Sequence, residues 1–481
     1  MKKFDIPKLK GKKPKFMLSI APWDMWEGEP DTIYPLGIAY LAAVLEKEGY
    51  EVDVLNLTYG NWEDAKEEVA KRIKKFDPDF FGISILSNSR ISALKLISVV
   101  KEIKPDIPIF AGGVHTTFMY EQILNAFPVD IAVLGEGEIT TIECLDAIIK
   151  KKSVNDFKAI KGIAFKHEGK IIKTELRERI RNLDDLPIPK HELFKEIIIK
   201  TKNAFIMSSR GCPFGCSFCP SSAFWGRCIT KRSPENVVKE IMYLLKHFPT
   251  IEQISFEDDE FACDNNRTIG ICNLLIKNNI KIKWTCLARV SSINEELIIL
   301  MKKAGCIQIT FGMESGSQRI LDLLGKKVKI DELVKAYKLC KKYDIAAGVL
   351  TIVGLPGENK KSVNETIKTL RKMGAVSEPA ILIIYPGTEV YRLAKEKGLM
   401  TDEYWLGEGL CPLYTCEHPK WKLWLWAFKI GFVSHFYNGK WSDIKDPPSF
   451  SNFLYRKIIK KFTNLDSFKR ITKRYLTDKT D

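Results

Sequence analysis

Apolar positions in the first third of the chain follow two alternating periods, which predict strands and helices in turn. Short apolar runs typical of buried strands occur at residues 16–20, 52–57, 80–86, 109–112 and 131–134. Apolar residues at helical spacing fill the segments between them, at residues 35–49, 61–76, 89–104 and 140–150. Strands that alternate with helices predict an α/β domain whose parallel sheet is covered on both faces. We expect this Rossmann-like, flavodoxin-like domain at residues 14–150.

The same alternation returns in the second half of the chain. Strands are predicted at residues 204–208, 253–256, 283–287, 307–313, 346–353 and 380–385. Helices are predicted at residues 234–247, 265–278, 294–304, 331–343 and 360–374. Six strand–helix units predict a partial (β/α)6 barrel at residues 204–400, with functional residues at the carboxyl ends of the strands.

Two further segments complete the predicted organisation. Residues 151–203 combine a hairpin, which turns at Glu168-Gly169, with a proline-containing strap that we expect to link the two domains. Residues 401–481 are basic and aromatic, and predict a helical C-terminal extension. That composition fits either a cap that packs its tryptophans on the barrel or an amphipathic helix on an anionic membrane.

Composition narrows the class of protein. The chain has 481 residues, of which 45% are hydrophobic, but it contains no run of about 18 apolar residues that would span a membrane. Its basic start lacks the apolar run of a secretory signal. Twelve cysteines at irregular spacing favour a reducing, cytoplasmic location over a disulfide framework.

The net charge of +15 raises the question of a nucleic-acid or membrane partner. Most lysines alternate with glutamates along the chain, which is typical of a solvated surface, so we expect no nucleic acid. The exception is the C-terminal region, where Trp421–Trp426 and Arg456–Arg474 combine cations with aromatic and aliphatic residues. Contact with a membrane surface therefore stays open for that region. Cys411 and Cys416, which lie just before it, receive no role.

Three cysteines in one loop carry the strongest chemical signal. Cys212, Cys216 and Cys219 stand at spacing C-x3-C-x2-C, and Gly211 and Gly215 leave room for a bulky group beside the backbone. Because a [4Fe–4S] cluster normally takes four cysteines, three would leave one iron free to bind a small molecule. A structural zinc site is the alternative, but zinc requires a fourth close ligand.

This loop resembles the signature of the radical S-adenosylmethionine (SAM) superfamily, C-x3-C-x-aromatic-C, with Phe218 as the aromatic residue. The resemblance implies that the open iron binds SAM and that one electron cleaves it to a 5′-deoxyadenosyl radical. It also implies that Phe218 lies beside the adenine.

Residues that follow the predicted barrel strands are candidates for binding SAM. Asp258 and Asp259 follow the second strand, where a carboxylate can meet the ammonium group of SAM or lie near the substrate. Arg289 follows the third strand, and its planar fork can pair with the SAM carboxylate. A helix cap or a surface ion pair is the alternative for each of them.

The family resemblance extends to the next two strands. It implies that residues at the end of the fourth strand contact the ribose hydroxyls, and these are Glu314, Ser315 and Gly316. Gly354 ends the fifth strand and stands in place of a looser glycine-containing motif of the family.

Loops at the strand ends of the first domain suggest a second cofactor. The residues concerned are Ser84 and Leu86, then Gly112, Gly113 and His115, then Gly135, Glu136 and Gly137. The S-x-L and G-G elements resemble those of the cobalamin-binding domain, where they line the channel for the nucleotide tail. The family's D-x-H-x2-G element is absent, because residues 21–26 contain no histidine, so we expect an open or water-occupied lower face of the corrin. A flavodoxin-like module without cobalamin is the alternative.

Taken together, the chain resembles the cobalamin-dependent radical SAM enzymes, most of which are class B methyltransferases. The resemblance implies methylation of an unactivated carbon in a small-molecule substrate, with a [4Fe–4S] cluster, SAM, cobalamin and an external ferredoxin- or flavodoxin-type electron donor. A lipid-like substrate is a hypothesis that rests only on the basic, aromatic C-terminal region. Two alternatives stay open: a cyclase or oxidative rearrangement enzyme like the anaerobic tetrapyrrole cyclases, and a membrane- or nucleic-acid-binding protein with a structural cluster.

Overall fold

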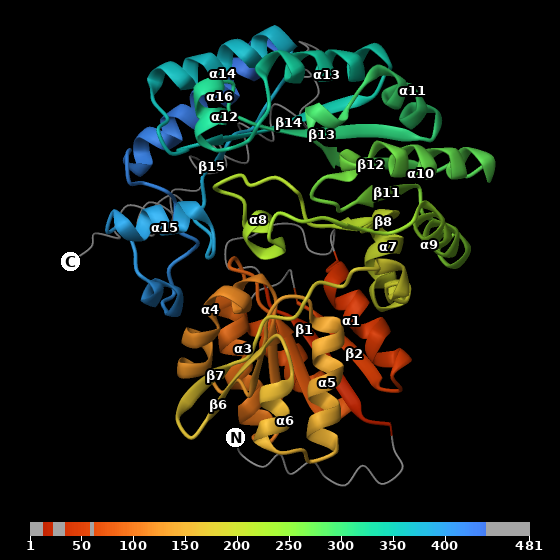
Figure 1. The fold of residues 1–481 in the computed structure, drawn as a ribbon, viewed down its shortest axis with the longest axis vertical. Coiled ribbons are helices and arrows are strands. Elements are labelled where there is room, and N and C mark those ends of the chain that lie inside the picture. The colour runs from red at the N-terminus through yellow and green to blue at the C-terminus, as the bar shows by residue number, and fades with distance from the viewer. Residues whose placement is uncertain (1–12, 23–33, 58–61, 439–481) are drawn as a thin grey trace.

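The computed structural model describes residues 13–22, 34–57 and 62–438, and these form two α/β domains joined by several connections (Figure 1). The lower domain in Figure 1 contains a seven-stranded sheet in the order β2-β1-β3-β4-β5-β6-β7. Its strands are β1 (Lys15–Ile20), β2 (Glu51–Asn56), β3 (Phe80–Ser84), β4 (Ile109–Gly112), β5 (Ile131–Val133), β6 (Ile163–His167) and β7 (Lys170–Lys173). The first five are parallel, and their 2-1-3-4-5 order is flavodoxin-like.

Helices cover both faces of this sheet, as the sequence predicts. They are α1 (Leu36–Lys47), α2 (Trp62–Phe76), α3 (Arg90–Ile103), α4 (Val114–Ala126) and α5 (Gly137–Ile149). Side chains alternate along β1, so that Phe16 and Leu18 pack in one core with α1 and α5, while Met17 packs in another with α2 and α3. Burial on both faces explains why these strands read as continuous apolar runs.

Two features of this domain differ from the sequence-based prediction. The prediction does not include helix α4. Residues 114–126 mix polar and apolar residues without a clear apolar face, and the helix kinks at Met119. The hairpin β6–β7 is not part of the linker but extends the sheet antiparallel to β5. Phe165 of β6 is fully buried and packs on Phe157 of α6 (Val154–Ala159), which fixes the hairpin to the domain.

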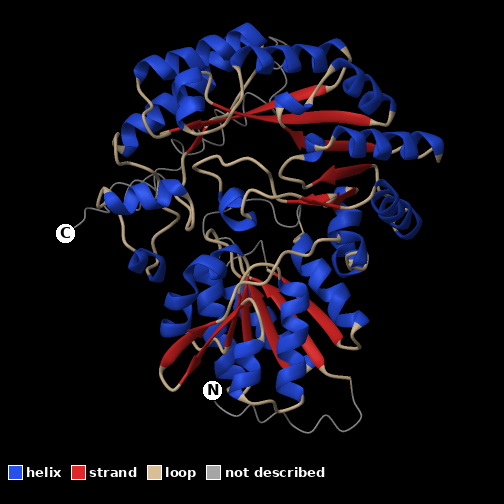
Figure 2. Cartoon of the chain, in the orientation of Figure 1, coloured by secondary structure: helices blue, strands red, loops and turns tan. Residues whose placement is uncertain are grey.

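The upper domain is an open barrel of six parallel strands in the order β15-β14-β13-β12-β11-β8 (Figure 2). The strands are β8 (Asn203–Ile206), β11 (Gln253–Phe256), β12 (Lys283–Ala288), β13 (Cys306–Glu314), β14 (Ala346–Val353) and β15 (Ala380–Ile381). The covering helices are α9 (Pro234–His247), α10 (Asn265–Lys277), α11 (Glu295–Lys303), α13 (Ile330–Lys342) and α14 (Lys360–Met373). The predicted partial (β/α)6 barrel is confirmed. Only β15 is much shorter than predicted, because Ile383 pairs with Leu413 instead.

Short elements connect and decorate the barrel. They are the turns η1 (Leu183–Asp185) and η2 (His191–Phe194), α7 (Lys195–Thr201), the ribbon β9 (Ser209–Arg210) with β10 (Thr230–Lys231), α8 (Pro220–Trp225), η3 (Phe261–Cys263), η4 (Val290–Ser292), α12 (Gln318–Leu323), α15 (Glu389–Glu396) and η5 (Asp402–Leu406). The last described helix is α16 (Lys420–Asn438), which packs beside α14. The helical extension is thus confirmed up to residue 438, and Arg456–Arg474 lie outside the described residues. None of the described helices combines the length and the apolar character needed to cross a bilayer.

A buried polar network joins the two domains beside α1. Tyr34 Oη lies 2.9 Å from Nδ1 of His191, whose Nε2 lies 2.8 Å from a carboxylate oxygen of Glu240. The other oxygen of Glu240 pairs with Arg232, and Arg232 donates to the hydroxyl of Tyr40. All five side chains are buried. Burial alone would raise the pKa of Glu240, but Arg232 and His191 hold it below its ordinary value.

Neutralising Glu240 should therefore weaken the junction. We expect Glu240→Gln to destabilise the protein by about 3–5 kcal/mol, because it leaves the Arg232 guanidinium buried without a counter-charge. Chemical denaturation followed by circular dichroism measures the change. Glu252→Gln is the matched control, since Glu252 pairs with Lys202 at 2.5 Å but both are exposed, and its effect should stay below about 1 kcal/mol. An equal effect of the two substitutions would contradict the role of the network.

Candidate functional site

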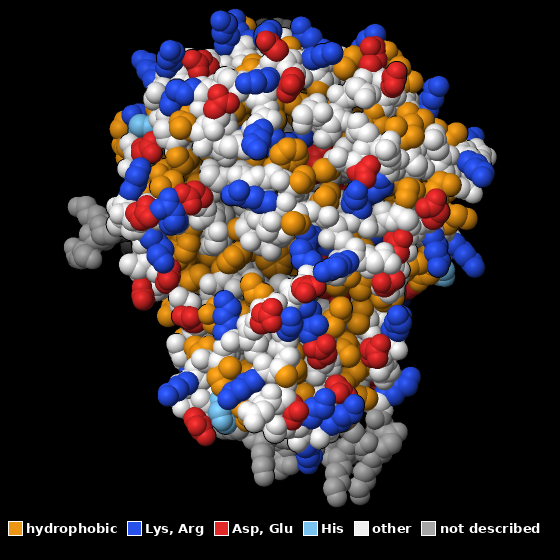
Figure 3. All heavy atoms as spheres, viewed as in Figure 1, with side chains coloured by type: hydrophobic (Ala, Val, Ile, Leu, Met, Phe, Trp, Pro, Cys, Tyr) orange, Lys and Arg blue, Asp and Glu red, His pale blue; other side chains and the backbone are white. Residues whose placement is uncertain are grey.

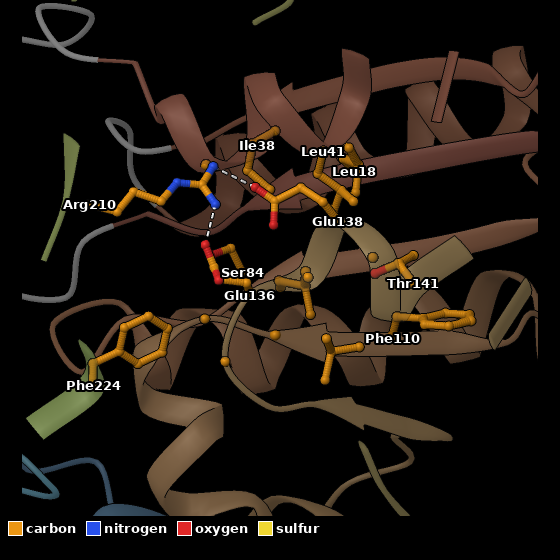
Figure 4. Close-up of a pocket in the computed structure, with 18 of the residues that line it drawn as sticks. Leu18, Ile38, Leu41, Ser84, Phe110, Glu136, Glu138, Thr141, Arg210 and Phe224 are labelled. Atoms are coloured by element: carbon orange, nitrogen blue, oxygen red, sulfur yellow. Dashed lines mark hydrogen bonds and ion pairs between the residues drawn. The ribbon is translucent and has the colours of Figure 1, made fainter. Parts of the chain in front are cut away.

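A cavity of about 210 Å³ opens at the carboxyl ends of β1 and β3, where the strand order of the first domain reverses. Phe16, Leu18 and Phe110 form its sheet side, and Ile38 and Leu41 of α1 form its helix side (Figure 4). The barrel domain closes the cavity from above with four residues, Met207, Arg210, Phe224 and Trp225. In the space-filling view, hydrophobic side chains show in the hollow between the two domains (Figure 3). Open α/β sheets bind ligands at this position.

Glycines create the space in this cavity. A Cβ on Gly82 would lie 2.7 Å from the ring of Phe16, so the floor admits no side chain there. A Cβ on Gly37 of α1 would meet no atom within 4 Å, and so this position borders open space. Gly113 has a φ of +94°, and a Cβ there would lie 2.7 Å from the carbonyl oxygen of Ile85. The result is a cavity with a mainly apolar lining.

Most residues predicted to hold cobalamin do line this cavity. Those that line it are Ser84, Gly112, Gly113, Gly135, Glu136 and Gly137. Leu86 and His115 are not among the lining residues. His115 is buried, lies 3.0 Å from Ser87 Oγ through Nδ1, and packs edge-on against Trp405. Burial and the nearby Arg90 lower its pKa to about 3, so its ring is neutral.

An ion pair between the domains borders the cavity. Arg210, two residues before Cys212, donates from its two terminal nitrogens to Glu136 and Glu138, at 2.6 Å each (Figure 4). All three side chains are at most 7% exposed. Burial would lower the pKa of Arg210, but the two carboxylates raise it, so the guanidinium stays charged. The second oxygen of Glu136 accepts from Ile180 N–H at 2.8 Å. This carboxylate therefore connects the first domain to both the linker and Arg210 at the edge of the cavity.

The cysteine loop runs from β9 to α8, and the three predicted thiols lie on it. Cys219 is the residue that precedes α8, and Cys212, Cys216 and Cys219 are all partly buried. Gly211 has a φ of +85°, and a Cβ there would lie 2.3 Å from the carbonyl oxygen of Cys228 and 2.9 Å from Trp225. Only glycine fits this close approach. Trp225 thus contacts the cysteine loop and also lines the cavity of the first domain.

The donor set of the loop fits an iron–sulfur cluster better than a single ion. Among the residues that the structure describes, no three His, Cys, Asp or Glu side chains converge as the ligands of one metal ion would. In a cluster each thiolate binds its own iron, so the sulfurs need not converge. Burial raises the pKa of Cys212 to about 11 and also raises that of Cys219, while N–H groups of Ser221 and Ser222 stabilise the Cys219 thiolate. Iron binding would displace the thiol protons.

Arg289 lies against the cysteine loop. Its guanidinium is 3.6 Å from the ring centre of Phe214 and reaches Cys216 Sγ at 3.9 Å. It also donates to the carbonyl oxygen of Lys326. The structure therefore places a buried positive charge beside the cysteine loop, at the mouth of the barrel where the sequence predicts the SAM carboxylate.

The two predicted aspartates have different surroundings. Asp258 is buried and accepts from Ser208 N–H and the hydroxyls of Ser208 and Ser209, at 2.5–2.6 Å, with Arg267 nearby at 3.7 Å. Its carboxylate is thus occupied by the strand that leads into the cysteine loop, and not by a ligand. Asp259 is solvent-accessible, but partial desolvation by the surrounding protein raises the pKa of its carboxyl group. Hydrogen bonds from Ser221 and from the backbone N–H of Gly211 act in the opposite direction and lower this pKa.

The predicted ribose-binding residues at the end of β13 are mostly held by protein. Glu314 has an unusual φ of +59° and makes a buried ion pair with Lys326 at 2.6 Å. Ser315 is fully buried and lies 3.3 Å from the hydroxyl of Thr366 on α14. A Cβ on Gly316 would lie 2.5 Å from the Thr366 backbone. These contacts fix the β13 loop to α14.

Gly354 and Phe218 also have structural contacts. Gly354 has a φ of +86°, donates its N–H to Glu358 at 2.7 Å, and borders Leu423 of α16. Phe218 is partly buried against an apolar cluster that includes Leu324, Leu355 and Val390. These placements fix the loop ends of the barrel.

Sequence reasoning missed several residues at this site. The sequence predicts no role for Arg210, which stands two residues before Cys212, or for Glu138, which stands beside the predicted Gly135–Gly137 loop. Phe224 and Trp225 follow Cys219 by a few residues. Two adjacent aromatic residues so close to the cysteine loop are the sequence feature that could have indicated a role at this site. Their importance depends on the contact between two domains, which periodicity does not predict.

Two domain families match the chain. The B12-binding domain family matches residues 30–145, and the radical SAM superfamily matches residues 206–370. The first match contains most of the cavity residues, and the second contains the three cysteines. The two matches fall on the two structural domains described above.

Relatives and solved structures agree with these matches. An uncharacterized methyltransferase of Pyrococcus horikoshii is 34% identical over 377 residues, which are 77% of this chain and 80% of the relative. The anaerobic magnesium-protoporphyrin IX monomethyl ester cyclase of Rubrivivax gelatinosus is 32% identical over 70% of this chain and 62% of its own length. The radical S-adenosylmethionine methyltransferase TsrM of Kitasatospora setae, solved with cobalamin and a [4Fe–4S] cluster, superposes with a TM-score of 0.67. At 18% identity over 80% of this chain and 78% of that one, this likeness concerns the fold.

The contacts of Asp258 lead to a test of the cysteine loop. We expect Asp258→Asn to lower the iron bound per chain at least severalfold, because an amide nitrogen cannot accept the Ser208 and Ser209 hydrogen bonds. Iron content and the visible cluster spectrum after anaerobic reconstitution measure the effect. Glu257→Gln on the same loop is the control, since this exposed neighbour makes no such contacts. Full iron loading of Asp258→Asn would show that the carboxylate does not position the loop.

Proposed function

The chain belongs to the cobalamin-dependent radical SAM methyltransferase-like family, and we propose that it transfers a methyl group to an unactivated carbon of a small molecule. One observation carries the proposal: Arg210 and Trp225 border both the cysteine loop and the cavity of the first domain. A bound cluster would supply the electron that cleaves SAM reductively, and a bound cobalamin would supply the methyl group. A shared border brings both groups to one substrate space, as a short-lived radical requires.

We assign the cluster to Cys212, Cys216 and Cys219 of the barrel domain, residues 204–400. Arg289 holds a positive charge beside Cys216 and opposes the burial that raises the pKa of Cys212. Asp259 remains the candidate for the SAM ammonium group, because it is accessible and lies next to the loop. Asp258 and Glu314 act as positioning residues, since each is committed to buried partners of the protein.

We assign cobalamin to the domain of residues 14–150, with its nucleotide tail in the cavity between the sheet and α1. Gly37 borders open space at this cavity, and Phe16 and Ile38 provide apolar contacts. Phe224 and Trp225 of α8 enclose the opening from the barrel side, which limits the access of water. Residues 21–26 lack a histidine, so this loop supplies no imidazole to the lower face.

The proposal includes partners and location. A one-electron donor of ferredoxin or flavodoxin type is needed, because the chain itself provides a single cluster loop. The substrate is a small molecule. Buried cysteines such as Cys144, Cys272 and Cys340 are free thiols in the structure, which suits the reducing cytoplasm.

Product analysis tests the reaction. We expect protein reconstituted anaerobically with iron, sulfide and hydroxocobalamin, then reduced in the presence of SAM, to form 5′-deoxyadenosine and S-adenosylhomocysteine. Mass spectrometry measures both. Cys216→Ala should abolish deoxyadenosine, whereas Cys228→Ala, on an exposed thiol outside the motif, should not. Deoxyadenosine without S-adenosylhomocysteine would favour a cyclase, and the absence of both products from a sample with an intact cluster would contradict the proposal.

The cavity gives an independent test of the cofactor. We expect Gly37→Leu to weaken cobalamin binding at least tenfold, because Gly37 lines the cavity and a leucine there takes up space beside it without a clash at its Cβ. Equilibrium dialysis with hydroxocobalamin measures the affinity. Lys47→Leu places the same side chain at an exposed position in the last turn of α1, and should leave the affinity unchanged. Equal affinities for both variants would mean that the cofactor does not use this cavity.

A further inference from the structure

Helix α16 is apolar around its whole circumference, although only one face of it is covered by described residues. Leu423, Trp426 and Ile430 are buried against the barrel. The opposite face carries large apolar side chains that are 39–63% exposed, namely Trp421, Leu425, Phe428, Phe432 and Phe436. A helix that is apolar on all sides is normally enclosed by protein or lipid. The outer face therefore requires a partner.

These five residues form a continuous row, here called the aromatic stripe. They recur every three or four positions, so they lie on one side of the helix. The rings of Phe428 and Phe432 stack with centres 5.7 Å apart, and those of Phe432 and Phe436 with centres 6.0 Å apart. A connected row of this kind is a binding surface rather than a set of scattered exposed residues.

Cations border the aromatic stripe. A groove of about 440 Å³ between α14 and α16 is lined by Trp421, Leu425, Phe428 and Phe432 together with the lysines Lys360, Lys422 and Lys429. A second groove along α14 is lined by Lys360, Lys361 and Lys368. Among the described residues that line the two grooves, Glu365 is the single acid. The surface thus combines an apolar centre with a positive margin.

We propose that the aromatic stripe and these lysines bind the surface of a bilayer that contains anionic phospholipids. Tryptophan and phenylalanine rings enter the region between head groups and acyl chains, while lysine side chains reach the phosphates. This surface lies on the outside of the barrel, and the proposal does not depend on which reaction the enzyme performs.

Charge argues against two other occupants. A second copy on a twofold axis would bring the lysines of both copies together around the same contact, which repels. Residues 439–481 contain 11 Lys and Arg against 5 Asp and Glu, so this segment would add positive charge to a positive surface. Both sets of cations complement an anionic bilayer instead.

Vesicle flotation of the full-length reconstituted protein tests the proposal. We expect binding to vesicles of phosphatidylcholine and phosphatidylglycerol in equal parts, and a clear loss of binding at high salt. The triple variant Trp421→Ser, Phe428→Ser, Phe432→Ser should bind at least tenfold more weakly. Each of Lys422→Gln and Lys429→Gln should weaken binding roughly fivefold. The control Ile199→Ser, Met242→Ser removes comparably exposed apolar residues elsewhere and should bind normally.

Several results would overturn the proposal. One is wild-type protein that stays unbound with anionic vesicles at low salt, and another is a triple variant that binds as well as wild type. Hydroxyl-radical footprinting without lipid gives a third check, because it reports the exposure of Trp421 and Phe428. Protection in a monomeric sample would assign the stripe to another part of the same chain, and protection in a dimeric sample would assign it to a second copy.

Discussion

The buried charge of Arg210 is the constraint on which the arrangement of the two domains depends. A guanidinium removed from water needs anionic partners, and here both partners, Glu136 and Glu138, belong to the other domain. Moving the domains apart would break both hydrogen bonds between Arg210 and these carboxylates. Because Arg210 precedes Cys212 by two residues, the ion pair also fixes the start of the cysteine loop relative to the cavity. The position of the cysteine loop relative to the cavity therefore depends on this interaction.

Charged residues at the mouth of the barrel serve the same purpose of holding loops in place. Asp258 is satisfied by the hydroxyls of Ser208 and Ser209, and Glu314 by Lys326. Sequence reasoning treated such carboxylates as ligand-binding groups because they follow strands on the functional face. In the structure their lone pairs are used by the protein, and Arg289 and Asp259 remain beside the cysteines. A catalytic face therefore needs polar residues that contact no ligand, because exposed loops must be fixed before they can position one.

The predictability of this molecule follows the range of the interactions involved. Strands such as β11 and β14 were predicted to the residue, because burial on both faces gives a local apolar run bounded by polar turns. The three cysteines and the glycine loops were also local patterns. Helix α4 was missed because its apolar residues serve a kinked segment, and the β6–β7 hairpin was misplaced because only its pairing with β5 shows its domain. Arg210 and Trp225 gain their meaning from contacts across domains, which no local pattern contains.

His115 illustrates how the third connection between the domains works. The sequence offered it as a cofactor residue, but its ring packs against Trp405, which comes from the C-terminal side of the barrel. Arg90, next to it, donates to the carbonyl oxygens of Trp405 and Gly407. This contact, the Arg210 ion pair and the Glu240 network are formed by different segments of both domains. Three separate attachments resist rotation as well as separation, so the cavity and the cysteine loop keep one orientation relative to each other.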